Sequence, residues 1–449
     1  MGIFKTYDIR GIYGKEINTD TAYRVGRAFV RFLKSDSYMV GYDARLHSKE
    51  LYQSLIDGIL DEGKDVCGIG MVSTPLLHFS QIKGGFGGGV MVTASHNPPE
   101  YHGFKLYDGQ GGSVSYSKGL NEIERIVKEE LSDIQRGTGS KGNFNNEDTL
   151  QGYIDFLKSK VSKGLEGMKL VIDPSNGSSG RVFESLIDAI GVDGTVINGE
   201  PDGRFPAHGP NPLKPESSAD ISAKIRETGA DFGAILDGDG DRVLFVDERG
   251  QKIENYFLSS LIAEELLEKQ PGASIVYDLI ASRVLPERIE ELGGRAIVSR
   301  VGYTFLYDEM VRNGAIFGSE TSGHVYFKVT DTYYTESAAY AVVTLMNLLQ
   351  KKGKRLSELI EPLMGRYYQS GEINVEIERK EDALKLIEQH FSDGEVSKLD
   401  GISVAYNDVW FNVRPSNTEP VLRIRLEGRR RETVESKKSE ILNLVKQVS

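Results

Sequence analysis

Cysteine is almost absent from this chain, since Cys67 is the only one in 449 residues. No intrachain disulfide can form, and a reducing compartment such as the cytoplasm is the expected location. Long apolar runs are missing too. No stretch approaches the ~18 residues of a membrane-spanning helix, and the first residues lack the apolar segment of a signal peptide. We therefore expect no membrane association.

The chain also lacks a surplus of positive charge. The chain has 54 Lys and Arg against 66 Asp and Glu, which gives a formal net charge of −12 at pH 7. Nucleic acid and anionic membranes are therefore not expected partners, and an anionic substrate would need a local cluster of cations. The length exceeds what one hydrophobic core usually holds, so it predicts about three domains, or four if they are small.

The most distinctive segment is Asp237-Gly238-Asp239-Gly240-Asp241-Arg242. Two short apolar runs flank it, residues 232–236 and 243–246, and both are typical of buried strands. Three carboxylates separated by single glycines in a tight loop offer hard oxygen ligands to one cation. This pattern predicts a Mg²⁺ or Ca²⁺ site.

Two other interpretations of this segment exist. An EF-hand loop would use Asp237, Asp239, Asp241 and Glu248 at its first, third, fifth and twelfth positions. It is rejected because Arg242 occupies the sixth position, where that loop needs glycine, and because strands rather than helices flank the segment. A solvated turn stays open, although crowding three carboxylates without a cation costs repulsion.

Strands and helices alternate along most of the chain, which predicts α/β units with parallel or mixed sheets. Apolar strands that end in aspartate recur at residues 40–43, 170–173 and 275–278, and this suggests a triplicated α/β unit. Beyond about residue 365, four strands and two helices predict a separate α+β domain. The expected domains are residues 1–145, 146–247, 248–364 and 365–449.

Ser95 lies in Thr93-Ala94-Ser95-His96-Asn97-Pro98-Pro99, after a strand expected at residues 89–93. The prolines cannot continue a strand ladder, so the serine is presented on a rigid loop at a strand end, where such sheets place their chemistry. A turn without function is the other interpretation. A hydrolase is disfavoured, since adjacent Ser and His seldom form a dyad and the chain has no G-x-S-x-G segment. Lys105 follows shortly after this loop.

Three further segments are polar. Tyr7-Asp8-Ile9-Arg10-Gly11 is expected to be a loop. Gly318-Ser319-Glu320-Thr321-Ser322-Gly323-His324 follows a strand expected at residues 315–317 and carries groups suited to hydrogen-bonding a polyol. Arg414-Pro415-Ser416-Asn417-Thr418-Glu419-Pro420 offers an arginine with hydroxyl and amide donors, as a phosphate clamp does. Each of the last two could also be a purely structural loop.

In this order, the segments at residues 7–11, 93–98, 237–242, 318–324 and 414–418 resemble those of the α-D-phosphohexomutase family. The resemblance covers nearly the whole chain. It implies a heart-shaped protein of three related α/β domains with mixed sheets and a smaller C-terminal α+β domain. One loop from each domain would meet in a central cleft.

The resemblance also implies roles for single residues. Ser95 is similar to the family's phosphoserine, and the Mg²⁺ ligands would be Asp237, Asp239, Asp241 and an oxygen on phosphorylated Ser95. The residues implied in catalysis are Ser95, His96, Lys105, Arg10, Arg242 and His324, with Lys105 and His324 as candidates for general acid and base. The residues implied in substrate binding are Tyr7, Glu320, Ser322, His324, Arg414, Ser416, Asn417, Thr418 and Arg423.

The implied reaction moves a phosphoryl group between the 1- and 6-positions of mannose and/or glucose phosphates. It would pass through phospho-Ser95 and a hexose 1,6-bisphosphate that also serves as activator. Ile280 stands where the bifunctional bacterial enzymes have a substrate-contacting lysine, and Tyr303 stands where a histidine is expected, so some contacts should differ. A phosphoglucosamine mutase, a phosphosugar-binding protein without turnover and a phosphatase are the alternatives. A monomer and a dimer both fit the sequence.

Overall fold

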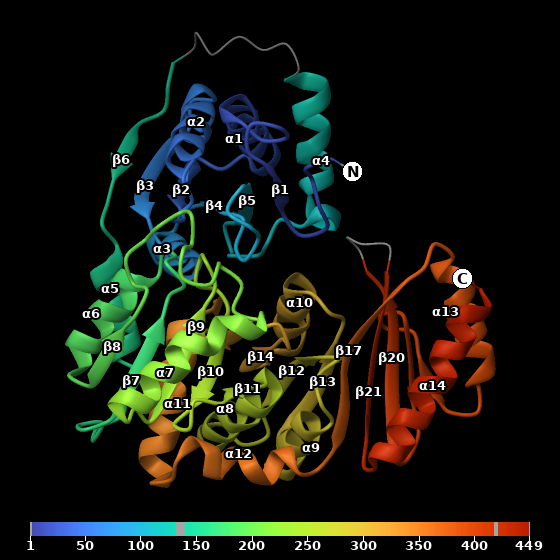
Figure 1. Ribbon diagram of the computed structural model, residues 1–449. Coiled ribbons are helices and arrows are strands. Elements are labelled where there is room, and N and C mark those ends of the chain that lie inside the picture. Colours follow the sequence, from blue (N-terminus) through green and yellow to red (C-terminus); the bar gives the residue numbers. More distant parts are fainter. Residues whose placement is uncertain (1, 132–139, 417–420, 449) are drawn as a thin grey trace.

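The computed structural model describes residues 2–131, 140–416 and 421–448, and these ranges form four sheets. Figure 1 shows three α/β units packed together, with a fourth unit, drawn in red, beside them. The predicted fold class, three related α/β units and a smaller α+β unit, is confirmed. The domain limits after residues 145, 247 and 364 stay a prediction. No helix in the described ranges is long and apolar enough to cross a membrane.

The first unit is a six-stranded sheet with helices against it. In spatial order the strands are β1 (Ile9–Ile12), β5 (Tyr101–Asp108), β4 (Gly88–Val92), β2 (Ser37–Tyr42), β3 (Asp65–Met71) and β6 (Phe144–Asn146). The helices are α1 (Thr19–Leu33), α2 (Ser48–Asp61), α3 (Thr74–Gly84) and α4 (Leu120–Arg125), with a 3₁₀ turn at Tyr116–Lys118 and a π-helical turn at Ile126–Glu130. Glycines let α1 and α2 pack closely, because a Cβ on Gly26 would lie 2.3 Å from the carbonyl oxygen of Leu55.

The second and third units are five-stranded sheets. The second has strands β11 (Lys252–Ile253), β10 (Val243–Asp247), β9 (Phe232–Leu236), β7 (Lys169–Asp173) and β8 (Asp193–Val196), with helices α5 (Leu150–Lys158), α6 (Gly180–Ile190) and α7 (Ala219–Thr228) and a 3₁₀ turn at Pro215–Ser218. The third has strands β13 (Arg295–Ser299), β12 (Ser274–Asp278), β14 (Phe317–Ser319), β15 (Val325–Lys328) and β16 (Tyr334–Glu336). Its helices are α8 (Asn255–Lys269), α9 (Val284–Glu291), α10 (Tyr303–Asn313), α11 (Ala338–Lys352) and α12 (Leu356–Met364).

The three α/β sheets share one pairing pattern, although the first also has β6 beside β3 and takes its outermost strand, β1, from the N-terminal segment. In each, a central strand (β2, β7 or β12) pairs in parallel with a neighbour on both sides, and two antiparallel strands extend the sheet beyond the second neighbour. This topology confirms the predicted triplication. Asp43, Asp173 and Asp278 stand at the carboxyl ends of the central strands. Their carboxylates accept hydrogen bonds from Thr93 beyond β4, Ser175 beyond β7 and Thr321 beyond β14, respectively.

The C-terminal unit is an antiparallel sheet with two helices. Its strands are β17 (Tyr368–Glu376), β21 (Val421–Gly428), β20 (Val409–Pro415), β19 (Ile402–Ala405) and β18 (Glu395–Ser397), and its helices are α13 (Lys380–His390) and α14 (Arg431–Gln447). It has an apolar core of its own, whereas one continuous core includes residues of all three α/β units. Polar contacts tie it to the third unit, as where Glu427 Oε1 accepts the backbone N–H of Arg283 at 2.9 Å.

Two local expectations were wrong. The strand expected at residues 315–317 is β14, which begins only at Phe317, where pairing with Ile275 starts. Ala315 and Ile316 are buried, but burial alone does not place a residue in a strand. The segment at residues 7–11, expected to be a loop, contains β1 from Ile9 onward. This strand forms because the edge of β5 is free to pair with it in antiparallel register.

Candidate active site

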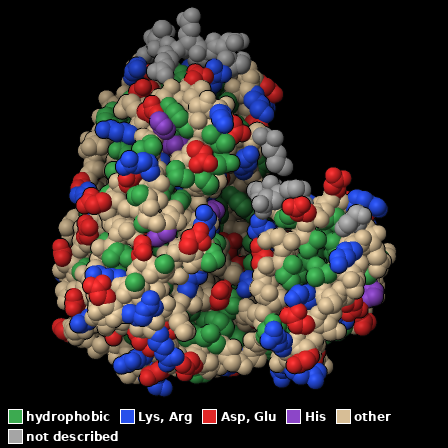
Figure 2. Space-filling view, in the orientation of Figure 1, with side chains coloured by type: hydrophobic (Ala, Val, Ile, Leu, Met, Phe, Trp, Pro, Cys, Tyr) green, Lys and Arg blue, Asp and Glu red, His purple; other side chains and the backbone are tan. Residues whose placement is uncertain are grey.

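Three of the predicted loops meet directly. The Ser95 loop contacts the carboxylate loop, since Ser95 Oγ donates to Asp237 Oδ2 at 2.7 Å. The carboxylate loop contacts the loop after β14, since Arg242 Nε donates to His324 Nε2 at 3.0 Å. Figure 2 shows a hollow between the α/β units and the C-terminal unit. Segments that are far apart in the sequence therefore form one polar site.

Ser95 is held in an uncommon backbone conformation. Its φ of 52° lies in the left-handed region, which disfavours residues with a Cβ. Its N–H donates to Thr93 Oγ1 at 2.9 Å, and the residue is 1% exposed. His96 Nδ1 lies 3.4 Å from Ser95 Oγ. Burial and the nearby Arg242 and Arg10 lower the pKa of His96 well below its usual range, so this imidazole is neutral. Strain of this kind is typical of functional loops.

Arg45 is a site residue that the sequence did not reveal. Its guanidinium is fully buried and pairs with Asp43 at 3.1 Å, and the ring of Phe205 from the second unit lies 5.1 Å from it. It donates to four carbonyl oxygens at 2.6–2.9 Å, those of Ser95, Asn97, Pro98 and Tyr101. Arg45 therefore fastens the Ser95 loop to the end of the central strand.

Replacing Arg45 by lysine is expected to destabilise this loop. The ammonium keeps the charge but has three donors on a flexible stem in place of a planar five-donor fork, so at least one buried carbonyl loses its partner. We expect a loss of about 2–4 kcal/mol and faster hydrogen exchange of the amides at residues 95–97, 100 and 101, measured by thermal unfolding and mass spectrometry. Arg24→Lys, in a partly exposed pair with Asp20, is the control and should cost about 0.5 kcal/mol or less. Equal losses in both variants would contradict this role.

Asp237, Asp239 and Asp241 fit a divalent cation. Their ligand atoms lie within 4.8 Å of one another. Asp237 Oδ1 accepts the backbone N–H groups of Gly240 at 3.0 Å and Arg242 at 3.2 Å, which fixes the loop. The Oδ1 atoms of Asp239 and Asp241 are buried and have no hydrogen-bond partner in the described part of the chain. Buried carboxylate oxygens without partners call for a cation, and hard oxygen ligands suit Mg²⁺.

Lys105 on β5 supplies positive charge to the same carboxylates. Its Nζ donates to Asp239 Oδ2 at 2.7 Å and also contacts Asp241. Burial alone would lower the pKa of Lys105, but Asp239 and Asp241 raise it well above its usual range. Burial, together with repulsion from Asp241 and Asp239, raises the pKa of Asp237. Thr74, another residue absent from the sequence prediction, donates to Asp239 Oδ2 at 2.6 Å.

The loop after β14 presents Glu320 and Ser322. Ser322 Oγ donates to Glu320 Oε2 at 2.8 Å, and the Glu320 N–H donates to the His324 carbonyl at 2.9 Å. Asp278 holds the loop by accepting both the N–H and the hydroxyl of Thr321, at 2.6 and 2.8 Å. A carboxylate and a hydroxyl fixed side by side can bind neighbouring sugar hydroxyls.

Tyr7 and Arg10 reach the site from the N-terminal segment. Arg10 Nη1 donates to the carbonyl of Ala94, one residue before Ser95, at 3.1 Å, while Asp8 pairs with the same guanidinium at 2.7 Å. Tyr7 Oη donates to the carbonyl of Val301 at 3.2 Å. Burial and the nearby Glu320 raise the pKa of Tyr7 to about 12. Tyr7 therefore lies near the loop after β14 and stays a hydrogen-bond donor.

The predicted phosphate clamp lies in the C-terminal unit. Arg414 and Arg423 are direct partners across β20 and β21. Each lies 3.6 Å from a different oxygen of Glu372 on β17. The Ser416 N–H donates to the Val421 carbonyl at 2.9 Å. Asn417 and Thr418 lie outside the described residues. Two guanidinium groups side by side are suited to a phosphate group.

The two positions that depart from the family resemblance are buried. Ile280 is 7% exposed and Tyr303 is 8% exposed. The ring of Tyr303 stacks on the imidazole of His324, with centroids 5.3 Å apart. Tyr303 therefore packs against one of the predicted site residues.

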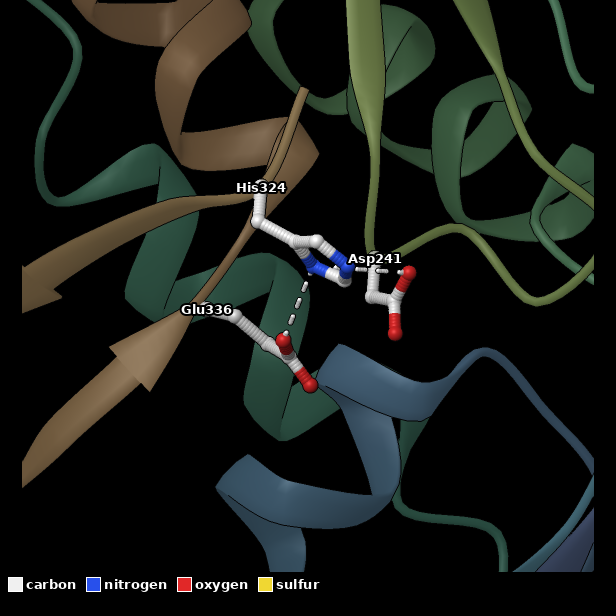
Figure 3. A group of neighbouring side chains, drawn as sticks. All are labelled: Asp241, His324 and Glu336. Atoms are coloured by element: carbon white, nitrogen blue, oxygen red, sulfur yellow. Dashed lines mark ion pairs between the residues drawn. The ribbon is translucent and has the colours of Figure 1, made fainter. Parts of the chain in front are cut away.

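Glu336 is a further residue that the sequence prediction missed. Its Oε2 lies 3.5 Å from His324 Nδ1, and Asp241 Oδ1 lies 3.8 Å from the same nitrogen (Figure 3). The antiparallel pairing of β15 with β16 brings Glu336 close to His324. No motif surrounds it in the sequence, so only the fold reveals it.

Four domain descriptions match the chain in order. "Phosphoglucomutase/phosphomannomutase, alpha/beta/alpha domain I" matches residues 1–133, domain II matches residues 151–250 and domain III matches residues 255–367. The C-terminal domain of the same description matches residues 372–444. Together they span most of the sequence.

Whole-length relatives carry related names. The chain is 39% identical over 446 residues to a phosphomannomutase of Methanocaldococcus jannaschii, covering 99% of this chain and 97% of the relative. It is 38% identical over 435 residues to a phosphomannomutase of Escherichia coli, covering 95% and 94%. A crystal structure of a phosphoglucomutase/phosphomannomutase family protein from Burkholderia thailandensis superposes with a TM-score of 0.89 at 31% identity, covering 99% of this chain and 97% of that one.

Proposed function

The chain belongs to the phosphoglucomutase/phosphomannomutase family and is a phosphohexose mutase, and we propose that Ser95 carries the transferred phosphoryl group. The observation that carries this proposal is the position of Ser95 Oγ. It lies 2.7 Å from Asp237 at the meeting point of three loops, on a backbone held in the left-handed region. Arg10 donates to the carbonyl of the preceding Ala94, and Lys105 and Arg242 pair with Asp239 and Asp237 of the carboxylate loop that Ser95 contacts.

The proposed reaction consists of two phosphoryl transfers. The phosphorus–Oγ bond of phospho-Ser95 breaks as a bond forms to the free hydroxyl of a hexose phosphate. The hydroxyl proton passes to a base, and Ser95 Oγ takes up a proton. The product is a hexose 1,6-bisphosphate, which turns around. The bond between its other phosphorus and the sugar oxygen then breaks as Ser95 Oγ gives up its proton and bonds to that phosphorus, and the sugar oxygen takes up a proton. The released sugar then carries its phosphate at the other position.

The surrounding residues position and neutralise the charges. Arg242 and Lys105 lie beside the carboxylate loop and can stabilise the negative charge of the moving group, which is the main requirement of phosphoryl transfer. His324 and Lys105 are the proposed acid and base groups. The strong pairing of Lys105 with two carboxylates favours its electrostatic role.

We propose that Asp237, Asp239, Asp241 and phosphorylated Ser95 hold Mg²⁺. A bound Mg²⁺ would polarise the phosphoryl oxygens and neutralise their charge. The unpartnered oxygens of Asp239 and Asp241 support this assignment. The hexose 1,6-bisphosphate is the proposed activator, because it can phosphorylate Ser95.

The substrate is proposed to be mannose and/or glucose phosphate. Glu320 and Ser322 would bind sugar hydroxyls, with Tyr7 beside them. Arg414, Arg423 and Ser416, with Asn417 and Thr418, would hold the phosphate that is not being transferred. A separate C-terminal unit suits this clamp, because the two phosphates must exchange places within one binding event. The lone, buried Cys67 fits the cytoplasm as the proposed location.

Product analysis tests this function. The protein is given Mg²⁺, a trace of glucose 1,6-bisphosphate, and mannose, glucose or glucosamine 1-phosphate in separate assays. We expect the mannose and glucose compounds to be converted to 6-phosphates. Conversion of the glucosamine compound alone would replace the substrate assignment. Release of inorganic phosphate without isomerisation would indicate a phosphatase, and binding without change would indicate a non-catalytic relative.

A further inference from the structure

His324 is held on three sides. Arg242 Nε donates to its Nε2 at 3.0 Å, and the ring of Tyr303 stacks on its face. On the third side Glu336 Oε2 lies 3.5 Å from Nδ1 (Figure 3). The imidazole is 2% exposed. Its orientation is therefore set by protein groups and not by solvent.

The hydrogen bond from Arg242 shows where the imidazole proton lies in this structure. A guanidinium has donors only and cannot accept a hydrogen bond. Nε2 of His324 must therefore be unprotonated in this arrangement, and a neutral ring carries its proton on Nδ1. That proton faces Glu336, with Asp241 Oδ1 slightly farther away at 3.8 Å.

Glu336 is placed to accept a hydrogen bond from Nδ1–H of His324. It is 3% exposed and ends β16, directly across the strand pair from Tyr326. Tyr326 Oη donates to Glu336 Oε2 at 2.8 Å, and Tyr107 Oη donates to Oε1 at 3.4 Å. Burial and the charge of Glu336 raise the pKa of both phenols, so they remain donors. Two fixed donors orient the carboxylate toward His324.

We propose that Glu336 is a positioning residue, whose carboxylate accepts Nδ1–H of His324 and thereby keeps Nε2 unprotonated and directed at Arg242. The separation of 3.5 Å is about 0.5 Å longer than an ordinary N–H···O bond. Such bonds often tighten only when substrate binds. What His324 does in turnover rests on the proposed function, whereas the position of its proton does not.

The alternative explanation of this cluster is a site for a second cation, since Asp241, His324 and Glu336 bring ligand atoms within 4.8 Å of one another. A cation on Nδ1 would require the ring proton to lie on Nε2, where it would face the N–H group of Arg242 instead of an acceptor. Crystals soaked in Mn²⁺ distinguish the two cases. Anomalous signal at the three aspartates alone is expected, and signal between His324 and Glu336 would overturn the proposal.

Nitrogen NMR of histidine tests the proposal without an assay. The chain has seven histidines, and the His324 signals are identified by their loss in His324→Asn. We expect wild-type His324 to be protonated at Nδ1 only. In Glu336→Met the signals of the two ring nitrogens should move toward each other, because Nδ1–H has lost its acceptor. Tyr153→Phe, which removes a buried hydrogen bond to the adjacent Ser337, should leave them unchanged. Unchanged signals in Glu336→Met would overturn the proposal.

Steady-state kinetics of the same variants provide a second test of the proposal. Glu336→Met should lower kcat by about 10- to 100-fold with KM changed by about threefold or less. Adding the same change to His324→Asn should cause no further loss. An equal loss in both backgrounds would show that Glu336 acts by another route and would overturn the proposal. Glu336→Gln is the second variant if methionine prevents folding, and a smaller loss of kcat is expected. Absence of any mutase activity in the wild type would refute the proposed function and leave the NMR result valid.

Discussion

Ser95→Ala is expected to lower mutase activity by about 10³-fold or more, because the variant lacks the oxygen that would carry the phosphoryl group between the two positions of the sugar. The backbone should keep its shape, since the hydrogen bonds that hold the loop come from Arg45 and from the Ser95 N–H. The change also removes the hydrogen bond from Ser95 Oγ to Asp237, but this bond is not one of those that hold the loop. Activity is followed with mannose 1-phosphate, Mg²⁺ and glucose 1,6-bisphosphate.

Intact-mass measurement gives the same prediction an independent readout. Wild-type protein incubated with glucose 1,6-bisphosphate should gain the mass of one phosphate, and Ser95→Ala should not. Ser80→Ala is the matched control, because Ser80 is also buried in the first unit and its hydroxyl bonds only to Thr149 among the described residues. It should keep both phosphorylation and activity. Phosphorylated, active Ser95→Ala protein would refute the role of Ser95.

The loops of the site could be predicted because the functional residues of each loop are consecutive, or nearly so, in the sequence. Three aspartates separated by glycines, or a carboxylate with three hydroxyl residues between two glycines and a histidine directly after them, are informative without any knowledge of the fold. The alternation of strands and helices predicted the α/β architecture, and strands ending in Asp43, Asp173 and Asp278 predicted the triplication. Each of these signals lies within a short stretch of sequence, so it can be found without knowing which segments the fold brings together.

The supporting residues could not be predicted in this way. Arg45 and Glu336 are single charged residues in ordinary surroundings, and such residues are usually solvated. Their roles depend on burial and on partners far away in the sequence. Arg45 reaches the carbonyl of Ser95, 50 residues later, only because β2 and β4 are neighbours. The hydrogen bond of Thr74 to Asp239 and the stacking of Tyr303 on His324 could not be predicted for the same reason. The sequence locates reacting groups, while the fold decides what holds them.

Strand boundaries also depend on partners. Residues 315–317 are as apolar as a buried strand, yet β14 is shifted toward the loop, where it pairs with both β12 and β15. The shift places Ser319 inside the sheet and leaves Glu320 as the first residue beyond it. Glu320 is therefore anchored directly by a strand, which suits a group that must bind sugar hydroxyls with fixed geometry.

Asp239→Asn is expected to abolish the response of this protein to Mg²⁺. The change keeps the size of the side chain but removes one negative charge, and its amide N–H₂ cannot bind a cation. Asp239 Oδ2 is already used by Thr74 and Lys105, so the free Oδ1 is the oxygen available to a cation. Activity with Mg²⁺ should fall by about 10²- to 10³-fold, the effect of losing several kcal/mol of charge stabilisation.

Thermal unfolding separates loss of the cation from loss of chemistry. A ligand that binds only the folded protein raises its melting temperature, so Mg²⁺ should raise that of the wild type and leave Asp239→Asn unchanged. Asp247→Asn is the control, since Asp247 is also buried in the second unit but accepts the backbone N–H groups of Arg249 and Gln251 at 3.0 and 2.8 Å. It should keep the Mg²⁺ response. If Asp239→Asn responds to Mg²⁺ as the wild type does, the cation lies elsewhere, and the unpartnered oxygens of Asp239 and Asp241 need another explanation.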